Sequence, residues 1–281
     1  MKRIGFAFNP TKPSAMEMCD QALRWCAAHG VEAWSRESND TPALIDELKT
    51  ADGLVVLGGD GTFLRAARAL AEVDVPVLGI NSGRIGFLSK VEPEALEYTL
   101  GELAIDNYGI ESRMMLEATL IRPSGTAHAP AGAFAALNDA AIVRGGEARV
   151  LRLDVEIDGS HLASYTADGV VVATPTGSTA YSFSAGGPIL DPTARNLVVT
   201  PVAAYLSSIR SIVVGPQHTV RVRLIDGPAG IISIDGRDDY PVAVGDIVEI
   251  RALPRPIRFI EPVGALPFWD LLRQKAALLP A

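Results

Sequence analysis

A glycine-rich turn that carries one acid is the part of this sequence best suited to phosphate chemistry. The apolar run Leu54–Leu57 leads directly into Gly58–Thr62, which reads Gly-Gly-Asp-Gly-Thr. Glycines let the chain bend sharply and let phosphate oxygens approach backbone N–H groups, and a following helix N-terminus adds partial positive charge. Asp60 can receive a proton from a hydroxyl group or hold Mg²⁺. The spacing is neither the Rossmann fingerprint nor a P-loop, and the alternative is a plain strand-to-helix turn.

Two polar segments lie next to other apolar strands. Asn81–Ser89 follows the run that ends at Ile80 and combines two glycines with Phe87. From its residues alone, it is either a binding loop or a loop that buries an aromatic ring. Asn138-Asp139 stands just before an apolar strand, where such a pair is typical of a turn. Neither segment defines a function by itself.

The segment Tyr165–Pro188 is dense in hydroxyl groups around the end of an apolar strand, Val170–Ala173. Hydroxyls on a turn beside the ring of Tyr181 suit hydrogen bonding to sugar and amide groups, with stacking on the ring. The alternative is a turn network of serine and threonine that binds no ligand. The hydroxyl side chains are Thr174, Thr176, Ser178, Thr179, Ser182 and Ser184.

Together these segments resemble a known family. Gly58–Thr62 is similar to the signature of a kinase superfamily that includes NAD kinases, diacylglycerol and sphingosine kinases and 6-phosphofructokinases. Asn81–Leu88 resembles the NAD kinase pattern Asn-x-Gly-x-x-Gly-Phe-Leu, and Asn138-Asp139 resembles its Asn-Glu pair with a shorter acid. Tyr165–Pro188 is the longest match, and it resembles NAD kinases rather than their lipid or sugar relatives. The resemblance runs from about residue 1 to 265.

Two later segments match the family less closely. Leu197–Val213 departs from it at Ala204–Ser207, where the family commonly has Pro-His-Ser-Leu, and at Ser211, where it has proline. Ser233–Arg237 resembles a late Asp-Gly segment that closes over the substrate, and a hairpin turn is its alternative reading.

The resemblance implies phosphorylation of the 2′-hydroxyl of the adenosine ribose of NAD, with ATP as donor and Mg²⁺ or another divalent cation as cofactor, to give NADP. It assigns catalysis to Asp60, which either orients and deprotonates the acceptor hydroxyl or acts mainly through the metal. The equivalent of Asp168 often reaches a neighbouring subunit in this family, so a homodimer or homotetramer is implied. The implied phosphate loop is Gly58, Gly59, Gly61 and Thr62, and the implied substrate contacts are Gly61, Arg65, Phe87, Asn138, Asp139, Arg149, Thr166, Asp168, Thr179, Ala180, Tyr181, Ser182, Ser184, Ala203 and Arg237.

The elements that must position these residues differ between the two halves of the chain. Up to about residue 105, short apolar runs alternate with helical patterns, which predicts a parallel sheet covered by helices on both faces. The predicted strands are Ile4–Phe8, Val31–Ser35, Leu54–Leu57 and Val75–Ile80. The predicted helices are Ser14–Ala28, Pro42–Lys49 capped by Thr41, Phe63–Ala71 capped by Thr62, and Pro93–Leu103.

The rest of the chain is expected to be mostly β. Asp-Gly turns at 158–159, 226–227 and 235–236 separate several short strand-like runs. We expect an α/β domain over 1–110 that holds the phosphate loop, and a β-rich dinucleotide-binding domain over 111–266. A C-terminal helix, Pro267–Leu279, is expected to pack back on the first domain. The predicted strands are Leu116–Arg122, Ala141–Val143, Arg152–Ile157, Gly169–Ala173, Val220–Ile225, Ile231–Ile234 and Ile247–Arg251.

Composition narrows the function classes. The 281 residues are 48% hydrophobic and 21% charged with a net charge of −8, which fits a protein with a full core and argues against nucleic-acid or anionic-membrane partners. Cys19 and Cys26 fit one buried helix face, the four histidines have no ligand spacing, and no signal peptide or membrane-length apolar run occurs. A cytoplasmic protein is expected.

Three rival functions remain open from the sequence. A lipid kinase would share the glycine-aspartate motif but should carry basic or amphipathic membrane-facing segments. A sugar-phosphate kinase should carry arginine clusters and an acidic catalytic segment. A non-catalytic NAD(H)-binding module should lack the catalytic acid, and Asp60 is present.

Overall fold

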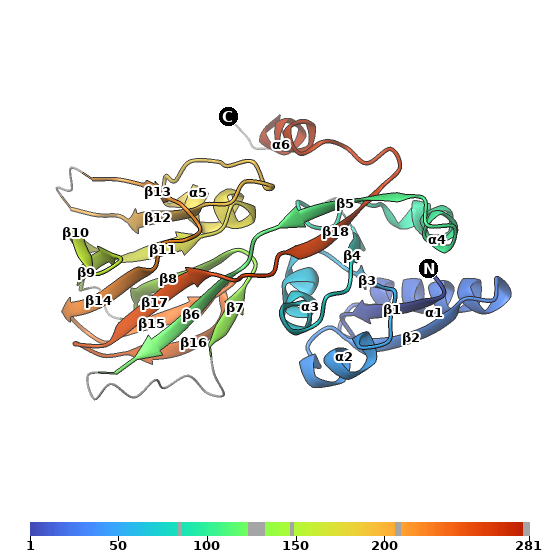
Figure 1. Cartoon of the computed structure of the whole chain (residues 1–281), viewed down its shortest axis with the longest axis horizontal. Helices are drawn as coiled ribbons and strands as arrows, with labels where there is room; N and C mark the ends of the chain where they lie inside the picture. The colour runs from blue at the N-terminus through green and yellow to red at the C-terminus, as the bar shows by residue number, and fades with distance from the viewer. Residues whose placement is uncertain (84–85, 123–132, 147–148, 206–208, 278–281) are drawn as a thin grey trace. The chain divides into compact units, whose positions relative to one another are not determined.

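The computed structural model describes residues 1–83, 86–122, 133–146, 149–205 and 209–277. The chain divides into two compact units (Figure 1). Unit 1 comprises residues 1–112 and 257–281, and unit 2 comprises residues 113–256.

Unit 1 is an α/β unit built on a six-stranded sheet in the order β2-β1-β3-β4-β18-β5. The pairs β1–β2, β1–β3, β3–β4 and β4–β18 are parallel. The strands are β1 (Arg3–Phe8), β2 (Glu32–Glu37), β3 (Gly53–Leu57), β4 (Val77–Ile80), β5 (Tyr108–Arg113) and β18 (Ile257–Pro262). The helices are α1 (Pro13–Ala28), α2 (Thr41–Leu48), α3 (Asp60–Glu72), α4 (Leu96–Ala104) with the 3₁₀ turn η1 (Pro93–Ala95) before it, and α6 (Phe268–Ala277).

Helices cover both faces of this sheet. On one face, apolar side chains of α1 and α4 form a core with alternate residues of the strands, among them Phe6 and Ile80. On the other face, Phe63 of α3 stacks on Phe259 of β18 with ring centroids 4.9 Å apart. All five residues of β3 are buried, as a parallel strand covered on both faces requires. Both cysteines are buried and free, as the sequence predicts.

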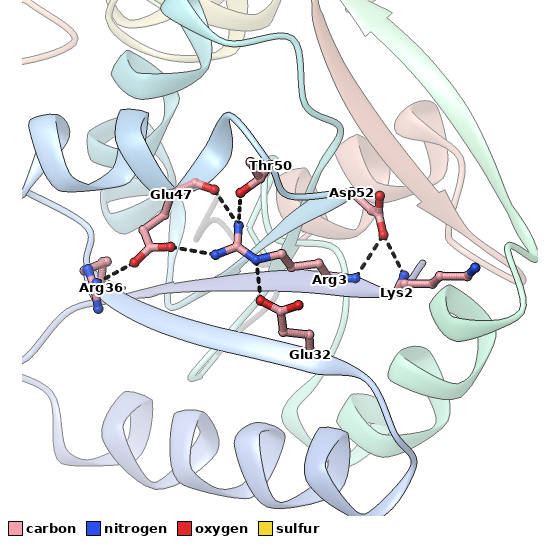
Figure 2. Close-up of polar contacts among 7 residues, drawn as sticks. All are labelled: Lys2, Arg3, Glu32, Arg36, Glu47, Thr50 and Asp52. Atoms are coloured by element: carbon pink, nitrogen blue, oxygen red, sulfur yellow. Dashed lines mark hydrogen bonds and ion pairs between the residues drawn. The ribbon is translucent and has the colours of Figure 1, made fainter.

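A polar network around Arg3 ties β1 to β2 and α2 (Figure 2). The guanidinium donates from Nε to Glu32 (2.7 Å), from Nη2 to the carboxylate of Glu47 (2.8 Å), and from Nη1 to the Glu47 carbonyl (2.9 Å) and the Thr50 hydroxyl. These acceptors raise the pKa of the Arg3 guanidinium, with the hydrogen bond to Glu32 as the largest cause. The side chain of Arg3 thus links β1 to two elements that follow later in the chain, β2 and α2.

Two helix starts in unit 1 differ from the prediction. Helix α3 begins at Asp60 with Gly59 as its N-cap, so Thr62 is buried within the first turn and is not the cap. An acid in the first turn is favoured there by the helix dipole. Helix α2 is capped by Asp40, whose side chain accepts a hydrogen bond from the Ala43 N–H, and not by Thr41. In both cases the true cap precedes the predicted one.

Unit 2 consists of two six-stranded sheets in which the recorded pairs are antiparallel. One sheet has the order β10-β9-β14-β17-β6-β7 and the other β13-β12-β11-β8-β15-β16. Buried residues of both sheets form one core, so the two sheets pack face to face. The elements are β6 (Leu116–Ile121), β7 (Phe134–Ala136), β8 (Asp139–Arg144), β9 (Leu151–Ile157), β10 (Ser160–Ala167), β11 (Gly169–Ala173), η2 (Thr176–Thr179), α5 (Tyr181–Ser184), β12 (Leu197–Val202), β13 (Ile212–Val214), β14 (Val220–Asp226), β15 (Gly230–Ile234), β16 (Arg237–Val242) and β17 (Ile247–Ala252).

The predicted fold class is confirmed: an α/β unit with a parallel sheet, a β-rich unit, and a C-terminal helix that belongs to the first unit. The end of the predicted terminal helix, residues 278–279, lies outside the described residues. Across the described ranges, no helix combines the length and the apolar character needed to cross a bilayer.

Candidate active site

The Gly58–Thr62 turn has the backbone geometry that its glycines allow. Gly58 has φ +147°, a value that L side chains rarely adopt, and a Cβ atom there would lie 2.6 Å from the Thr62 hydroxyl. Its N–H donates to the Ile80 carbonyl (2.8 Å), which anchors the turn between β3 and β4. The turn therefore needs glycine at this position for conformation and for space.

The carboxylate of Asp60 accepts hydrogen bonds from three consecutive backbone N–H groups. Oδ2 accepts from Phe87 (2.9 Å), and Oδ1 accepts from Leu88 (3.1 Å) and Ser89 (3.3 Å). The Ser89 hydroxyl in turn donates to the Gly58 carbonyl (2.9 Å). An ionised carboxylate has roughly four acceptor positions, so these contacts leave about one for a further donor.

The loop packs closely against the Asp60 carboxylate at Gly86, where a side chain would not fit. A Cβ atom on Gly86 would lie 1.8 Å from Oδ1 of Asp60. Next in the loop, the ring of Phe87 faces α6: its centroid lies 6.1 Å from that of Phe268, and the Lys275 ammonium lies 5.2 Å from it. Phe87, predicted to pack against the dinucleotide, is thus positioned by Asp60 through its N–H and by α6 through its ring.

Arg65 lies one turn into α3. Its Nε donates to the Ser38 hydroxyl (3.1 Å) and its Nη2 donates to the Thr62 hydroxyl (3.3 Å). Gly61, between Asp60 and Thr62, is exposed in the first turn of α3. These contacts fix Arg65 near the glycine turn, within the same unit.

In unit 2, the predicted Asn138-Asp139 pair borders a hollow of about 430 Å³. Such a volume falls within the range of pockets that bind small molecules. Asp139 begins β8 and Asn138 directly precedes it, while Ala180, between η2 and α5, and Tyr181, the first residue of α5, reach the same hollow. Two segments that are about 40 residues apart in sequence are therefore brought together, as the resemblance implies.

Asp139 is buried, and burial raises its pKa to about 7, with the charge of Asp235 as the second cause. The pKa of Tyr181 is also raised, first by burial and then by the charges of Asp139 and Asp168. A protonated Asp139 would donate one hydrogen bond, whereas the ionised form only accepts. The hollow thus contains a carboxyl group, that of Asp139, whose protonation state changes near neutral pH.

Asp235 lines this hollow; it lies in the segment Ser233–Arg237 that is expected to close over the substrate, but no role was predicted for its own side chain. Its turn, 235–236, closes the hairpin of β15 and β16, with φ +53° at Asp235 and +67° at Gly236. The segment thus forms a hairpin turn that borders the hollow, and its closure over the substrate stays a prediction. The Asp-Gly dipeptide in the sequence indicates a turn. It does not indicate which groups donate hydrogen bonds to the aspartate side chain.

The hydroxyl-rich segment divides between the hollow and the core. Ser182 is fully buried and shares a hydrogen bond of 3.1 Å with the Thr200 hydroxyl. Thr179 and Ser184 donate locally, to the carbonyls of Thr176 (3.2 Å) and Ala180 (3.5 Å). Part of the segment thus forms the serine-threonine network considered as its alternative, while its Ala180-Tyr181 step faces the hollow.

The other predicted contacts are not among the residues that line this hollow. Asp168 pairs with Arg144 through a contact of 2.9 Å. Ala203 has φ +49° and borders a second hollow of about 420 Å³ together with Arg210. Arg149 and Thr166 are exposed on the surface of unit 2, and Arg237 begins β16. Of the loosely matched segment, residues 206–208 lie outside the described ranges.

The described residues contain no group of three or more histidine, cysteine, aspartate or glutamate side chains able to hold a metal ion. Asp60, the acid of the glycine turn, is bound by backbone N–H groups instead. Mg²⁺ in kinases is commonly held by one or two carboxylates together with substrate phosphates and water.

Comparison with known proteins first defines the class. Residues 34–108 match the ATP-NAD kinase N-terminal domain, and residues 137–262 match the ATP-NAD kinase C-terminal domain. The glycine-aspartate turn lies in the first match and the hollow lies largely in the second. The protein is a kinase, that is, a phosphotransferase.

Full-length relatives then define the family. The chain is 39% identical to an NAD kinase of Symbiobacterium thermophilum, over 98% of this chain and 99% of that protein. It is 35% identical to an NAD kinase of Heliobacterium modesticaldum, over 98% of each. This chain belongs to the NAD kinase family, and the resemblance found in its sequence is confirmed.

Two solved structures share the fold. Yeast NADH kinase complexed with NADH matches with a TM-score of 0.85 and 26% identity, over 99% of this chain and 87% of that one. An NAD kinase from Archaeoglobus fulgidus in complex with ATP matches with a TM-score of 0.79 and 24% identity, over 99% of this chain and 100% of that one. The second likeness shows the fold alone.

Proposed function

We propose that this protein transfers a phosphoryl group from ATP to the 2′-hydroxyl of the adenosine ribose of NAD, giving NADP. Support comes from the names of its full-length relatives and from a neighbour of similar fold that holds NADH. The acceptor is thus an alcohol, and the donor and acceptor are both nucleotides. A divalent cation carried by the donor phosphates, a cytoplasmic location and a homodimer or homotetramer are parts of the same proposal.

The observation that carries the proposal is the state of Asp60. Its carboxylate is fixed by three backbone N–H groups and retains about one acceptor position. A fixed carboxylate with one acceptor position left can orient one hydroxyl group and accept its proton. It stands at the N-terminus of α3, where the helix dipole favours nearby phosphate.

Recognition of NAD is assigned to the hollow of unit 2. Asn138 and Asp139 offer an amide and a carboxyl group for the adenosine, and Tyr181, which is 40% exposed, offers a ring face. Ionised Asp139 would accept hydrogen bonds from hydroxyl groups of the ligand. The remaining proposed contacts are Gly61, Arg65, Phe87, Arg149, Thr166, Asp168, Thr179, Ala180, Ser182, Ser184, Ala203 and Arg237, with Gly58, Gly59 and Thr62 in the phosphate loop.

A direct assay tests the proposal. Purified protein is incubated with NAD, ATP and Mg²⁺, and NADP is detected with an NADP-specific dehydrogenase. Formation of NADP that requires all three additions is the expected result. Absence of NADP with ATP and with other phosphoryl donors, in protein that is folded by circular dichroism, would refute it.

A lipid kinase and a non-catalytic NAD(H)-binding module are the alternatives to exclude. Sedimentation with anionic vesicles separates the first, because a lipid kinase should bind them. Calorimetric binding of NAD without any NADP formation would identify the second.

A further inference from the structure

The side chain of Asp235 holds the segment that carries the Asn138-Asp139 pair. Its Oδ1 accepts hydrogen bonds from the N–H groups of Asn138 (2.7 Å) and Asp139 (3.2 Å), and its Oδ2 accepts from Leu137 (3.1 Å). The Asp235 N–H donates to the Asp139 carbonyl (2.9 Å). Asp235 thus fixes three consecutive residues from a position about 96 residues away in the chain.

The opposite side of the same segment is fixed as well. The carbonyls of Leu137 and Asn138 accept hydrogen bonds from the Thr174 hydroxyl and the Thr174 N–H. A Cβ atom on Gly177 would lie 2.1 Å from the Asn138 carbonyl oxygen. The backbone of the pair is therefore held by the turn between β15 and β16 on one side and by the start of η2 on the other. We call this arrangement of Asp235, Thr174 and Gly177 around Asn138-Asp139 the clamp of unit 2.

The clamp places two carboxyl groups together in a buried site. Asp235 is 7% exposed and Asp139 is 4% exposed. Two neighbouring carboxylates in a buried site repel each other, and the usual response is that one of them binds a proton. Asp235 accepts three backbone N–H groups, which favour its charged form. The proton therefore falls to Asp139, whose pKa is raised to about 7 first by burial and then by the charge of Asp235.

We propose that Asp235 is a positioning residue for nucleotide binding: it fixes the backbone of Asn138 and Asp139 at the hollow and controls the charge that Asp139 presents to the ligand. This inference rests on the proposed binding of NAD by that pair. Asp235 contacts the Asn138-Asp139 pair and not the reacting atoms. The affinity for NAD then depends on the ionisation of Asp139.

The direction of the pH dependence follows from the charges around Asp139. The titratable groups that line the hollow beside Asp139 are Asp235 from the hairpin turn, Tyr181 from α5 and Asp239 from β16, and the charge of Asp235 raises the pKa of Asp139. Ionised Asp139 accepts hydrogen bonds from ligand hydroxyls. Affinity for NAD should therefore be full above pH 8 and should fall as the pH decreases through about 7.

Asp235→Asn is the central test, with calorimetric NAD binding measured between pH 5.5 and pH 8.5. The amide removes the charge and offers one acceptor oxygen where the carboxylate offers two. We expect about 10-fold to 100-fold weaker binding at pH 8, because loosening a positioned group by about 1 Å has effects of this size. We also expect the pH at which affinity falls to move downward. Asp139→Asn should bind weakly without a step near pH 7.

A matched control is Asp246→Asn in the same unit. Asp246 is also buried, accepts the Ala243 N–H (2.9 Å) and pairs with Arg122 (2.7 Å), but it does not line the hollow. Its variant should lose stability while keeping the affinity for NAD and the pH profile. If Asp235→Asn does not fold, Asp235→Glu serves, with the charge retained: binding should weaken while the fall in affinity stays near pH 7.

Amide hydrogen exchange of the ligand-free protein gives a readout that needs no substrate. The N–H groups of Leu137, Asn138 and Asp139 should exchange at least 10-fold faster in Asp235→Asn than in wild type, and unchanged exchange would overturn the positioning role. Wild-type NAD affinity that is flat across pH 6 to 8 would overturn the electrostatic role. If wild type binds no NAD at all, the proposed function fails with it; if it binds and Asp235→Asn binds equally well, this inference alone fails.

Discussion

Two aspartates, one in each unit, show the same bonding pattern in different surroundings. Asp60 accepts the N–H groups of 87–89, and Asp235 accepts those of 137–139. Asp60 opens a helix and is only partly buried, whereas Asp235 lies in a hairpin turn at 7% exposure next to a second buried acid. A clamped carboxylate can therefore either act on a substrate or position the residues that do.

The difference in burial suggests that the two aspartates have different roles. A partly exposed carboxylate with an acceptor position left fits a role in the reaction itself. A buried carboxylate whose oxygens are taken by the backbone fits a role in the geometry and charge of its neighbours. Changes around Asp60 should therefore lower kcat, and changes around Asp235 should raise the KM for NAD.

The largest effect is expected for Asp60→Asn. Loss of the acceptor for the ribose hydroxyl should reduce turnover about 10²-fold to 10⁴-fold, while NAD binding persists because the hollow of unit 2 is unchanged. The coupled dehydrogenase assay measures turnover, and calorimetry measures binding. Asp74→Asn, an exposed acid of unit 1 that pairs with Arg258, is the control and should turn over normally. Near-normal turnover by Asp60→Asn would remove Asp60 from the mechanism.

A smaller but still large loss of turnover is expected for Gly86→Ala, which disturbs the contact between the Asp60 carboxylate and the loop at 86–89. The new methyl group would lie 1.8 Å from Oδ1 of Asp60, so the carboxylate or the loop must move. A displacement of about 1 Å should lower kcat about 10²-fold with little change in the KM for NAD. Gly101→Ala, whose methyl group would meet its nearest atom at 3.9 Å, should behave as wild type.

Gly177→Ala tests the clamp of unit 2 from the side opposite Asp235. Its methyl group would lie 2.1 Å from the Asn138 carbonyl oxygen, which should displace the pair and raise the KM for NAD about 10-fold. Steady-state kinetics separate this change from a change in kcat. Gly146→Ala, where a Cβ atom meets no described atom within 4 Å, is the control. A fall in kcat at unchanged KM would contradict the division between the units.

The smallest effect, on stability alone, is expected for Arg3→Ala. The network in Figure 2 is partly exposed to solvent, since Arg3 is 21% exposed and Glu32 68% exposed, so its loss should cost about 1 kcal/mol. This corresponds to a decrease in Tm of roughly 2–4 °C, measurable by calorimetry, with kcat and KM unchanged. Lys49→Ala, which removes only an exposed pair with Asp46, should change Tm by less than a degree or so.

Much of the architecture follows from local patterns. The four apolar residues Leu54–Leu57 indicate the strand β3, which begins one residue earlier at Gly53. Helix α1 was predicted to within one residue because its period, and Gly30 beyond its end, mark it clearly. The caps were predicted less well. Thr41 and Thr62 are acceptable caps by residue type, but Asp40 and Gly59 begin the helices because backbone conformation, which is not legible from residue type, decides between neighbours.

The site residues show the same limit. The resemblance pointed to Asn138, Asp139, Ala180 and Tyr181, and these four line one hollow. It gave no reason to expect that Ser182, one residue further on, is buried against Thr200. Adjacent residues on a short turn face in different directions, and a motif does not specify which side chain points to the ligand.

The sequence by itself determined the fold class, the glycine turn before α3 and the family, because these depend on neighbouring residues and on local periodicity. Only the tertiary structure decided that β18 joins the sheet of unit 1 through Phe259 and Val77, that Asp60 binds the loop at 87–89, and that Asp235 binds 137–139. Each of these contacts joins residues far apart in the chain. These contacts form only when the folded chain brings the two segments together. No local sequence pattern specifies which distant N–H groups will donate to a given carboxylate.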